Sequence, residues 1–367
     1  MPQDEPIAPS ATAEFLTRCS RQEQRFFYPC NAKHREPQPC TFSFRRGSGR
    51  GSATVRVEEC SFEEGGTGWR VWPCALLLAC WLASSEHVLG LSHGTTVLEV
   101  GCGLGLPGLT AAALGAADAV LSDCLPVLLG TLVRSARANA DSATRTRVAM
   151  LDWDLEASPR AEAAAEADEL QHEEYSTEQG VKAAQLAAVA ADAESTACPR
   201  DTAWQQLGES ERFGLLLASD VVYSMRHARQ LPKVLAGRLR SGGRVAAMVP
   251  VRSEAHTRCF LCGLLAHGFR LLVSRVDRPW VEGVTAIQRG AAEPAADGDA
   301  EDAARCWTRH TAANGKPFWH NARSQQSVWT DPALAAAWRE AATPFSADAP
   351  LREGEILFVD AVLPLAT

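Results

Sequence analysis

Glycines follow a short apolar segment near residue 100, an arrangement that allows close contact between backbone and ligand. The segment TVLEV leads into Gly101, Gly103 and Gly105, and a helical pattern comes next. A glycine loop at the end of a strand lets a ligand approach the main chain. The G-x-G-x-x-G spacing of dinucleotide sites is met from Gly103 but fails from Gly101. The glycines alone therefore leave open a dinucleotide or another nucleoside ligand.

Four flanking side chains favour a nucleoside that carries a cation. Glu99 lies two residues before Gly101, where a carboxylate can meet a ligand's amine but would repel a diphosphate. Asp123 ends the next apolar segment and can accept both hydroxyls of a ribose, which a nucleoside ligand of either kind would need. Asp152 and Trp153 follow the third segment, where they can hold an adenine amino group and ring. Together they describe an adenosine bearing an amino acid. The simpler alternative is that the acids cap helices and the glycines form a tight turn.

A parallel sheet is needed to bring these side chains together. Five short apolar segments alternate with helical patterns, which is typical of buried parallel strands in an α/β sheet. Two later segments lack a full helix between them and are expected to form an end pair. TFSFRRGSGRGSATVRVEE predicts a hairpin that turns at 47–51. The expected strands lie near 95, 118, 147, 213, 244, 269 and 355, and the expected helices at 109–115, 126–139, 227–239 and 254–267.

Five motifs occur in an order that resembles one family of enzymes. They are GWRVWPCALLLACWL (68–82), VLEVGCGLGLPGLTAA (97–112), LSD (121–123), LDW (151–153) and ASDVVY (218–223). The chain is similar to the seven-strand S-adenosylmethionine-dependent methyltransferases, and within them to the methyltransferase-like protein-lysine methyltransferases of family 16. The resemblance covers roughly 40–280 and the final strand. It implies a Rossmann-like seven-stranded sheet with helices on both faces.

The resemblance also implies S-adenosyl-L-methionine as the cofactor and a role for each matching residue. Trp72 would close the cofactor pocket, a role that only the resemblance suggests. By the resemblance, Asp123 would contact the ribose, and Asp152 and Trp153 would contact the adenine. The methionine part would contact Glu99, Gly101, Gly103 and Gly105.

The sequence Asp220-Val-Val-Tyr223 resembles the family's DxxY motif and predicts the acceptor site. A protonated lysine cannot attack a methyl group, so the site must orient a neutral amine for in-line displacement. Asp220 can bind the incoming ammonium and orient the amine after proton loss, and Tyr223 can supply a hydroxyl and an aromatic wall. The family favours a lysine of another protein, although related members modify histidine. The alternative is that Asp220 caps a helix and Tyr223 packs in the core.

A tryptophan-rich segment near the C-terminus resembles a WW domain. The sequence WTRHTAANGKPFWHNARSQQSVWTDP has that family's spacing, and the resemblance covers 303–334. By this resemblance Phe318, Ser327 and Trp329 form a groove for a Pro-rich, polyproline II segment. Phe318 lacks the hydroxyl of the usual tyrosine, and Ala322 replaces the usual histidine. A structural role without ligand binding is therefore the alternative.

Composition changes along the chain divide it into segments. Residues 156–212 hold 13 acidic and 4 basic residues and are rich in alanine, which is typical of an insertion. The segment that begins at 290 contains mainly small and acidic residues together with Pro and Gly, which is typical of a flexible linker. The expected organisation is an extension (1–40), a methyltransferase domain (41–289) with the insertion 156–212, a linker (290–302), the WW-like domain (303–334) and the final strand (335–367).

Charge and cysteine content exclude several classes of function. With 36 Lys and Arg against 44 Asp and Glu, the net charge of −8 makes nucleic acid an improbable partner. The longest apolar run, 72–83, is too short for a bilayer, and the N-terminus lacks signal-peptide features, so we expect a cytoplasmic or nuclear protein without membrane contact. The 12 cysteines show no zinc spacing, so no metal is expected. Two rivals remain: a non-catalytic interaction protein and a nicotinamide-dependent oxidoreductase.

Overall fold

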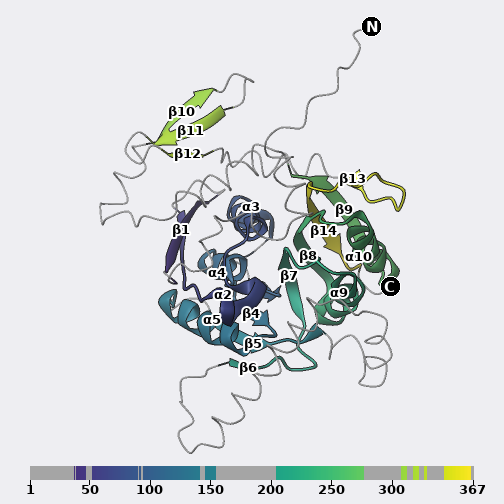
Figure 1. The fold of residues 1–367 in the computed structure, drawn as a ribbon, viewed down its shortest axis with the longest axis horizontal. Helices are drawn as coiled ribbons and strands as arrows, with labels where there is room; N and C mark the ends of the chain where they lie inside the picture. Colours follow the sequence, from purple (N-terminus) through teal and green to yellow (C-terminus); the bar gives the residue numbers. More distant parts are fainter. Residues whose placement is uncertain are drawn as a thin grey trace, which may run out of the picture.

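In the computed structural model, the described residues form one large sheet with helices against it and two smaller β units (Figure 1). The described residues are 37, 39–46, 52–89, 91, 94–140, 145–153, 204–276, 307–311, 317–321, 326–328 and 343–364.

Within the described residues, nine strands form one sheet in the order β13-β9-β14-β8-β7-β3-β4-β5-β6. These strands are β3 (Thr96–Val100), β4 (Asp118–Asp123), β5 (Arg145–Met150), β6 (Trp204–Gln206), β7 (Phe213–Ser219), β8 (Leu239–Pro250), β9 (Arg270–Arg275), β13 (Thr343–Pro344) and β14 (Ile356–Val362). The helices are α2 (Phe62–Gly65), a 3₁₀ turn η2 (Gly66–Gly68), α3 (Pro73–Leu89), α4 (Leu106–Ala113), α5 (Pro126–Ala138), α9 (Met225–Arg238) and α10 (Glu254–Ala266).

The sheet is mostly parallel, as the alternation of apolar segments and helices predicts. Strands β6, β5, β4, β3, β7 and β8 pair in parallel, whereas β14 lies antiparallel between β8 and β9. The predicted end pair is thus β9 with β14, and the predicted Rossmann-like sheet is confirmed. The sheet differs from the seven-strand expectation by two short edge strands, β6 and β13, which carry too few residues to show a periodic pattern in sequence.

Helices cover both faces of this sheet and bury two apolar cores (Figure 1). Side chains of one strand alternate between them: Leu215 and Leu217 face the core under α3, α4 and α5, whereas Leu216 and Ala218 face the core under α9 and α10. Because strand residues point alternately to the two faces, a strand buried on both is expected to be mostly apolar. This explains why the strand segments are mostly apolar runs.

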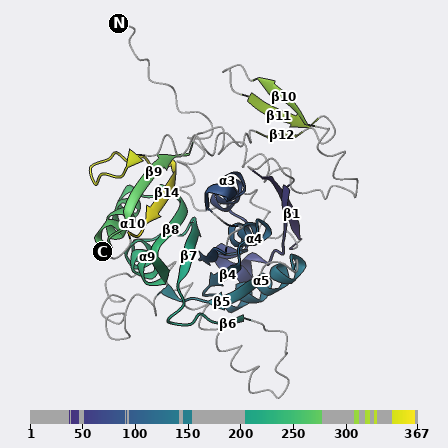
Figure 2. The same cartoon turned by 180° about the vertical axis from the view of Figure 1, so that it is seen from behind.

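The predicted hairpin precedes the sheet as β1 (Cys40–Arg45) and β2 (Ser52–Val57), which pair antiparallel with Arg45 opposite Ser52. Along β2 exposed and buried residues alternate, so only one face packs inward. Both views place the hairpin beside α4 and α5, with which β2 makes contacts (Figures 1 and 2). The turn at 47–51 lies outside the described residues.

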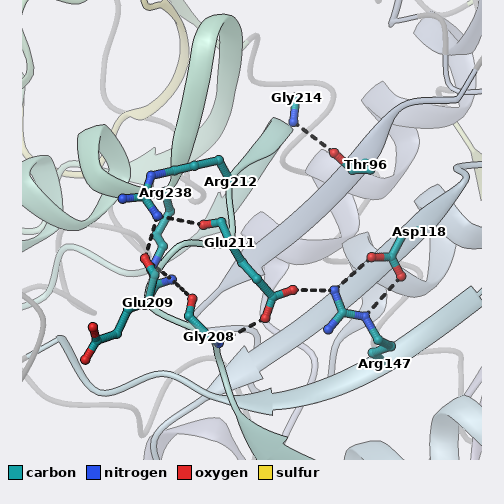
Figure 3. Close-up of polar contacts among 9 residues, drawn as sticks. All are labelled: Thr96, Asp118, Arg147, Gly208, Glu209, Glu211, Arg212, Gly214 and Arg238. Atoms are coloured by element: carbon teal, nitrogen blue, oxygen red, sulfur yellow. Dashed lines mark hydrogen bonds and ion pairs between the residues drawn. The ribbon is translucent and has the colours of Figure 1, made fainter.

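The end of the predicted acidic insertion belongs to the sheet. Strand β6, at 204–206, pairs with β5, and Glu211 joins an ion-pair network with the sheet (Figure 3). The Arg147 Nη2 atom lies 2.8 Å from Asp118 Oδ2 and 2.8 Å from Glu211 Oε2. The sequence average over 156–212 concealed this short strand. Residues 154–203, the bulk of the predicted insertion, lie outside the described residues.

Three strands form the separate antiparallel sheet β10-β11-β12, at Trp307–Thr311, Pro317–Asn321 and Gln326–Val328. In the register, Trp307 pairs with Asn321 and His320 pairs with Ser327. Strand β9 precedes this unit in the chain, and β13 and β14 follow it. Three antiparallel strands agree with the expected topology, but the identification as a WW domain stays a prediction. Trp329 lies outside the described residues.

Candidate functional site

The predicted ligand residues lie at one edge of the sheet, where its parallel strands end. We call it the carboxyl edge. The glycine loop follows β3, Asp123 ends β4, Asp152 follows β5, and Asp220 follows β7. In open α/β sheets, ligands bind outside the carboxyl ends of the strands where the chain changes direction across the sheet. Such a change occurs here, because β3 lies between β4 and β7.

Three glycines give the loop after β3 a backbone that other residues adopt at a cost. Gly101, Gly103 and Gly105 have φ angles of 60°, 52° and 77°. A Cβ at Gly101 would also lie 2.6 Å from Cζ2 of Trp153. The loop therefore requires glycine for its conformation, and at Gly101 for contact with the indole as well. Helix α4 begins directly after the loop at Leu106, three residues earlier than predicted, because Pro107 fits the first turn of a helix.

Glu99 is completely buried beneath this loop. Its Oε2 accepts a hydrogen bond of 2.7 Å from the Gly108 backbone N–H in the first turn of α4. Its Oε1 is buried and has no hydrogen-bond partner among the described residues. Burial raises the pKa of this carboxyl to about 8, although the Gly108 hydrogen bond acts in the opposite direction. The structure thus provides a buried acceptor beside the loop, and the predicted contact with a ligand's amine stays a prediction.

Asp123 is fixed by backbone donors at the end of β4. Its Oδ2 accepts from the Gly103 N–H at 3.0 Å, and its Oδ1 accepts from the Cys124 N–H at 2.8 Å. The first bond joins the end of β4 to the glycine loop, so the carboxylate and the loop keep one arrangement. The predicted role of Asp123 with a ribose is compatible with this place, although no contact tests it.

Trp153 links the glycine loop to the predicted acceptor motif through a histidine. The rings of Trp153 and His227 meet edge to face, with centroids 5.2 Å apart, and those of His227 and Tyr223 are 4.3 Å apart. His227 lies in the first turn of α9, and its N–H donates to the Ser224 hydroxyl that caps the helix. The neighbouring Asp152 is buried. His227 could not be predicted from sequence, because a lone histidine in a helical pattern carries no signal.

Asp220 adopts a strained backbone and pairs with an arginine that the sequence analysis also missed. Among the described residues it is the only one other than glycine with a positive φ, at 58°. Its carboxylate accepts hydrogen bonds from two nitrogens of Arg252: Nε lies 3.0 Å from Oδ1, and Nη2 lies 2.8 Å from Oδ1 and 2.7 Å from Oδ2. The Arg252 guanidinium carbon also lies 5.7 Å from the ring centroid of Trp72. The position of Arg252, two residues after a parallel strand, was the signal available in the sequence.

The structure therefore groups the predicted residues into three connected sets along one edge. One set joins Glu99, the glycine loop and Asp123, and another joins Trp153 to Tyr223 through His227. The last joins Asp220 to Trp72 through Arg252. Phe318 and Ser327 belong to the separate three-stranded sheet.

Two further classes of site find no support in the described part of the chain. It contains no group of three or more His, Cys, Asp or Glu side chains that could hold a metal ion. None of its helices is long and apolar enough to cross a membrane.

Comparisons with known proteins support the resemblance seen in the motifs. A family model described as lysine methyltransferase matches residues 52–169. The histone-arginine methyltransferase METTL23 of Rattus norvegicus is 39% identical over 88 residues, which are 23% of this chain and 36% of that protein. The same protein of Mus musculus is 41% identical over 86 residues, 22% of this chain and 32% of that protein. The match thus spans about a third of the length of each relative.

Solved structures are similar at a lower level. The magnesium protoporphyrin IX methyltransferase of Synechocystis PCC 6803, solved with bound SAM, has a TM-score of 0.36 and 13% identity, covering 74% of this chain and 93% of that chain. The [4+2]-cyclase SpnF has a TM-score of 0.39 and 15% identity, covering 80% of this chain and 81% of that chain. The assignment of the fold depends on the strand order given above and not on these scores.

Proposed function

We propose that this chain is an S-adenosylmethionine-dependent methyltransferase that acts on a side-chain nitrogen of another protein, with lysine as the acceptor that the family model favours. The observation that carries the proposal is the joint position of Glu99, the glycine loop and Asp123 at the carboxyl edge. The match of residues 52–169 to the lysine methyltransferase model supports it independently.

The residues at this edge fit the parts of the cofactor. Glu99 provides a buried carboxyl oxygen that has no partner among the described residues, which a ligand ammonium would satisfy. Asp123 is held by backbone donors in a place suited to a ribose. Asp123 suits the ribose of a dinucleotide equally well, so the preference for S-adenosylmethionine depends on Glu99 Oε1, whose need for a partner a ligand ammonium would satisfy. When bound, S-adenosylmethionine supplies an electrophilic methyl group on its sulfonium.

The chain's own part in the transfer is to position the acceptor. Asp220 and Tyr223 follow β7 at the same edge. A carboxylate there attracts a cationic side chain and orients its nitrogen, and the phenol ring forms a wall against which a cation is stabilised. Catalysis by such a site depends on geometry and electrostatics and needs no covalent enzyme intermediate.

Arginine is the second candidate for the acceptor. The two relatives from rat and mouse are named histone-arginine methyltransferases. The carboxylate of Asp220 binds a guanidinium, that of Arg252, within this structure. These observations favour arginine, whereas the description of the family model favours lysine.

We further propose a protein as the substrate and the cytoplasm or nucleus as the location of the chain. The segment that resembles a WW domain would bind Pro-rich segments through Phe318, Ser327 and Trp329.

The experiment that tests the proposal is transfer of a radiolabelled methyl group to protein acceptors. Core histones and a total protein extract treated to remove existing methyl groups provide the acceptors. We expect the wild type to label protein, and Asp220→Asn to lose at least 100-fold in rate while its affinity for S-adenosylmethionine stays within threefold. Asp348→Asn, an exposed aspartate in the described segment before β14, is the matched control. Equal rates for Asp220→Asn and the wild type would remove Asp220 from the site.

A further inference from the structure

The carboxylate that the acceptor would need is already bound to a cation of the chain itself. Nε and Nη2 of Arg252 lie 3.0 and 2.8 Å from Oδ1 of Asp220, and Nη2 lies 2.7 Å from Oδ2. The Asp220 side chain is 8% exposed, and the Arg252 side chain 26%. A carboxylate so deeply buried is costly without a partner, so the pair is a stable feature of the unbound protein.

Backbone contacts hold both members of the pair. The Asp220 N–H donates to the Met248 carbonyl at 3.0 Å, which ties the end of β7 to β8. The Arg252 N–H donates to the Pro250 carbonyl at 2.9 Å, directly after β8. Because the two strands are neighbours in the sheet, the carboxylate has a fixed place and direction. Arg252 must satisfy this geometry, and so must any cation that replaces it.

The geometry of the carboxylate matches a planar donor better than a point charge. A guanidinium presents several N–H groups in a rigid fork, whereas an ammonium is compact, strongly hydrated and not directional in that way. If an ammonium displaced Arg252, a single contact would replace the forked contact between the guanidinium and the Asp220 carboxylate. A substrate guanidinium would reproduce the contact that it displaces, so the exchange would cost little.

Arg252 lies beside the predicted wall of the cofactor pocket. Its guanidinium carbon is 5.7 Å from the centroid of the Trp72 ring, within the distance for a cation–π contact. The position that Arg252 occupies is therefore next to the place where the methyl group would be delivered. A cation in this position would have its nitrogens close to the reacting centre.

We propose that Asp220 forms a guanidinium-binding site, that Arg252 fills this site until substrate binds, and that the arginine side chain of a protein substrate takes its place. The geometry of the Asp220 carboxylate, with Arg252 as the competing group, then favours arginine over lysine as the acceptor. This inference rests on the proposed function for the identity of the site, but the binding of a guanidinium can be tested without any methyl transfer.

The test uses small cations as probes of the full chain with Arg252 truncated. Millimolar methylguanidinium chloride is titrated into Arg252→Ala, and thermal unfolding is followed by circular dichroism. We expect a saturable rise in Tm, because a ligand that binds only the folded state stabilises it. Methylammonium chloride should require at least tenfold higher concentration for the same rise.

Three control proteins make the result specific to Asp220. Wild type, in which the tethered Arg252 competes with the probe for the site, should require at least tenfold more methylguanidinium than Arg252→Ala for the same rise. The double variant Asp220→Asn/Arg252→Ala should show no saturable rise. Arg275→Ala breaks the exposed pair in which Arg275 Nε lies 2.9 Å from Glu355 Oε2, and it should respond as the wild type does, which excludes a general effect of lost arginines.

Several outcomes would overturn the inference. They are the absence of a saturable rise in folded Arg252→Ala, an equal response to methylammonium, and an equal response in the double variant. If Arg252→Ala does not fold, Arg252→Gln, which leaves no cation beside Asp220, takes the same titrations with the same criteria. A protein that fails to bind S-adenosylmethionine but passes this test would contradict the proposed function and leave the guanidinium site standing.

Discussion

Replacing Glu99 by glutamine changes the pH dependence of stability in a way that the structure specifies. The glutamine keeps an oxygen that can accept from the Gly108 N–H, the contact that Oε2 makes at 2.7 Å. It removes the ionisable carboxyl of Glu99, a side chain that has no solvent exposure. Burial raises the pKa of Glu99 from an ordinary 4.5 to about 8. Between these values the folded protein holds a proton that the unfolded chain has lost.

The sign and size of the effect follow from proton linkage. Since the folded state binds the extra proton, the stabilisation is complete below pH 4.5 and is lost as the pH rises to about 8. The free energy of unfolding falls by about 1.4 kcal/mol for each pH unit in this window, about 5 kcal/mol in total. In Glu99→Gln the free energy of unfolding does not fall with pH in this way. It is lowered by the same amount at every pH instead, because the amide group must be buried.

Urea unfolding of the wild type and Glu99→Gln at pH 5, 6, 7, 8 and 9 measures this difference. We expect the stability of the variant relative to the wild type to rise steadily with pH and to level off above pH 8. Other ionisable groups cancel in the difference. A difference that stays flat within about 0.5 kcal/mol from pH 5 to 9 would show that Glu99 is ionised throughout, and the argument from burial would be refuted.

The same proton reports on contact with a ligand. If the ammonium of S-adenosylmethionine approaches Oε1, the carboxylate becomes the favoured form and the proton is released on binding. Calorimetry at pH 6.5 in two buffers of different ionisation enthalpy should therefore detect up to one proton released by the wild type and none by Glu99→Gln. If both proteins released the same number of protons on binding, Glu99 would not be in contact with the ligand.

Two further substitutions test the loop and the opposite edge of the sheet. Gly101→Ala should lower stability by about 1–3 kcal/mol in urea unfolding, because of the φ of 60° and the 2.6 Å approach to Trp153, whereas Gly130→Ala, where a Cβ meets nothing, should not lower it. A neutral Gly101→Ala would contradict the described loop. Arg147→Ala should cost about 1–2 kcal/mol by loss of its pairs with Asp118 and Glu211. Its affinity for S-adenosylmethionine should stay unchanged, because this network lies where the strands begin, and a tenfold loss would count against that separation.

Periodicity and turn chemistry predicted most of the large sheet. Apolar runs marked β3, β4, β7 and the second half of β8, because these parts are buried on both faces and are mostly apolar, with the buried Glu99 as a polar residue inside β3. The hairpin was visible for the opposite reason, since only one of its faces packs inward and exposed residues alternate with buried ones.

The short edge strands were not predictable, and a physical reason explains each case. Strand β6 has three residues, of which Gln205 and Gln206 are exposed, so neither an apolar run nor an alternation can mark it. Strand β13 contains Pro344, which is tolerated there because the strand lies at an edge. Both depend on a neighbouring strand for their conformation.

In the site, the sequence predicted which residues gather at the carboxyl edge but not how they pair. Position at the end of a parallel strand was enough to group Asp123 and Asp220. The same position, two residues after β8, was a signal for Arg252 at this edge, but its pairing with Asp220 could not be found from sequence, because only the order of strands makes β7 and β8 neighbours. Contacts between side chains from separate strand ends require the fold.

Calorimetric titration of the purified chain with S-adenosylmethionine, and in parallel with NAD, tests the central claim most directly. Asp123→Ala is the variant that removes the predicted ribose contact, and Asp348→Asn is the control. The account predicts saturable binding of S-adenosylmethionine by the wild type and the control, at least tenfold weaker binding by Asp123→Ala, and no binding of NAD. Binding of NAD, or of neither ligand, would contradict it.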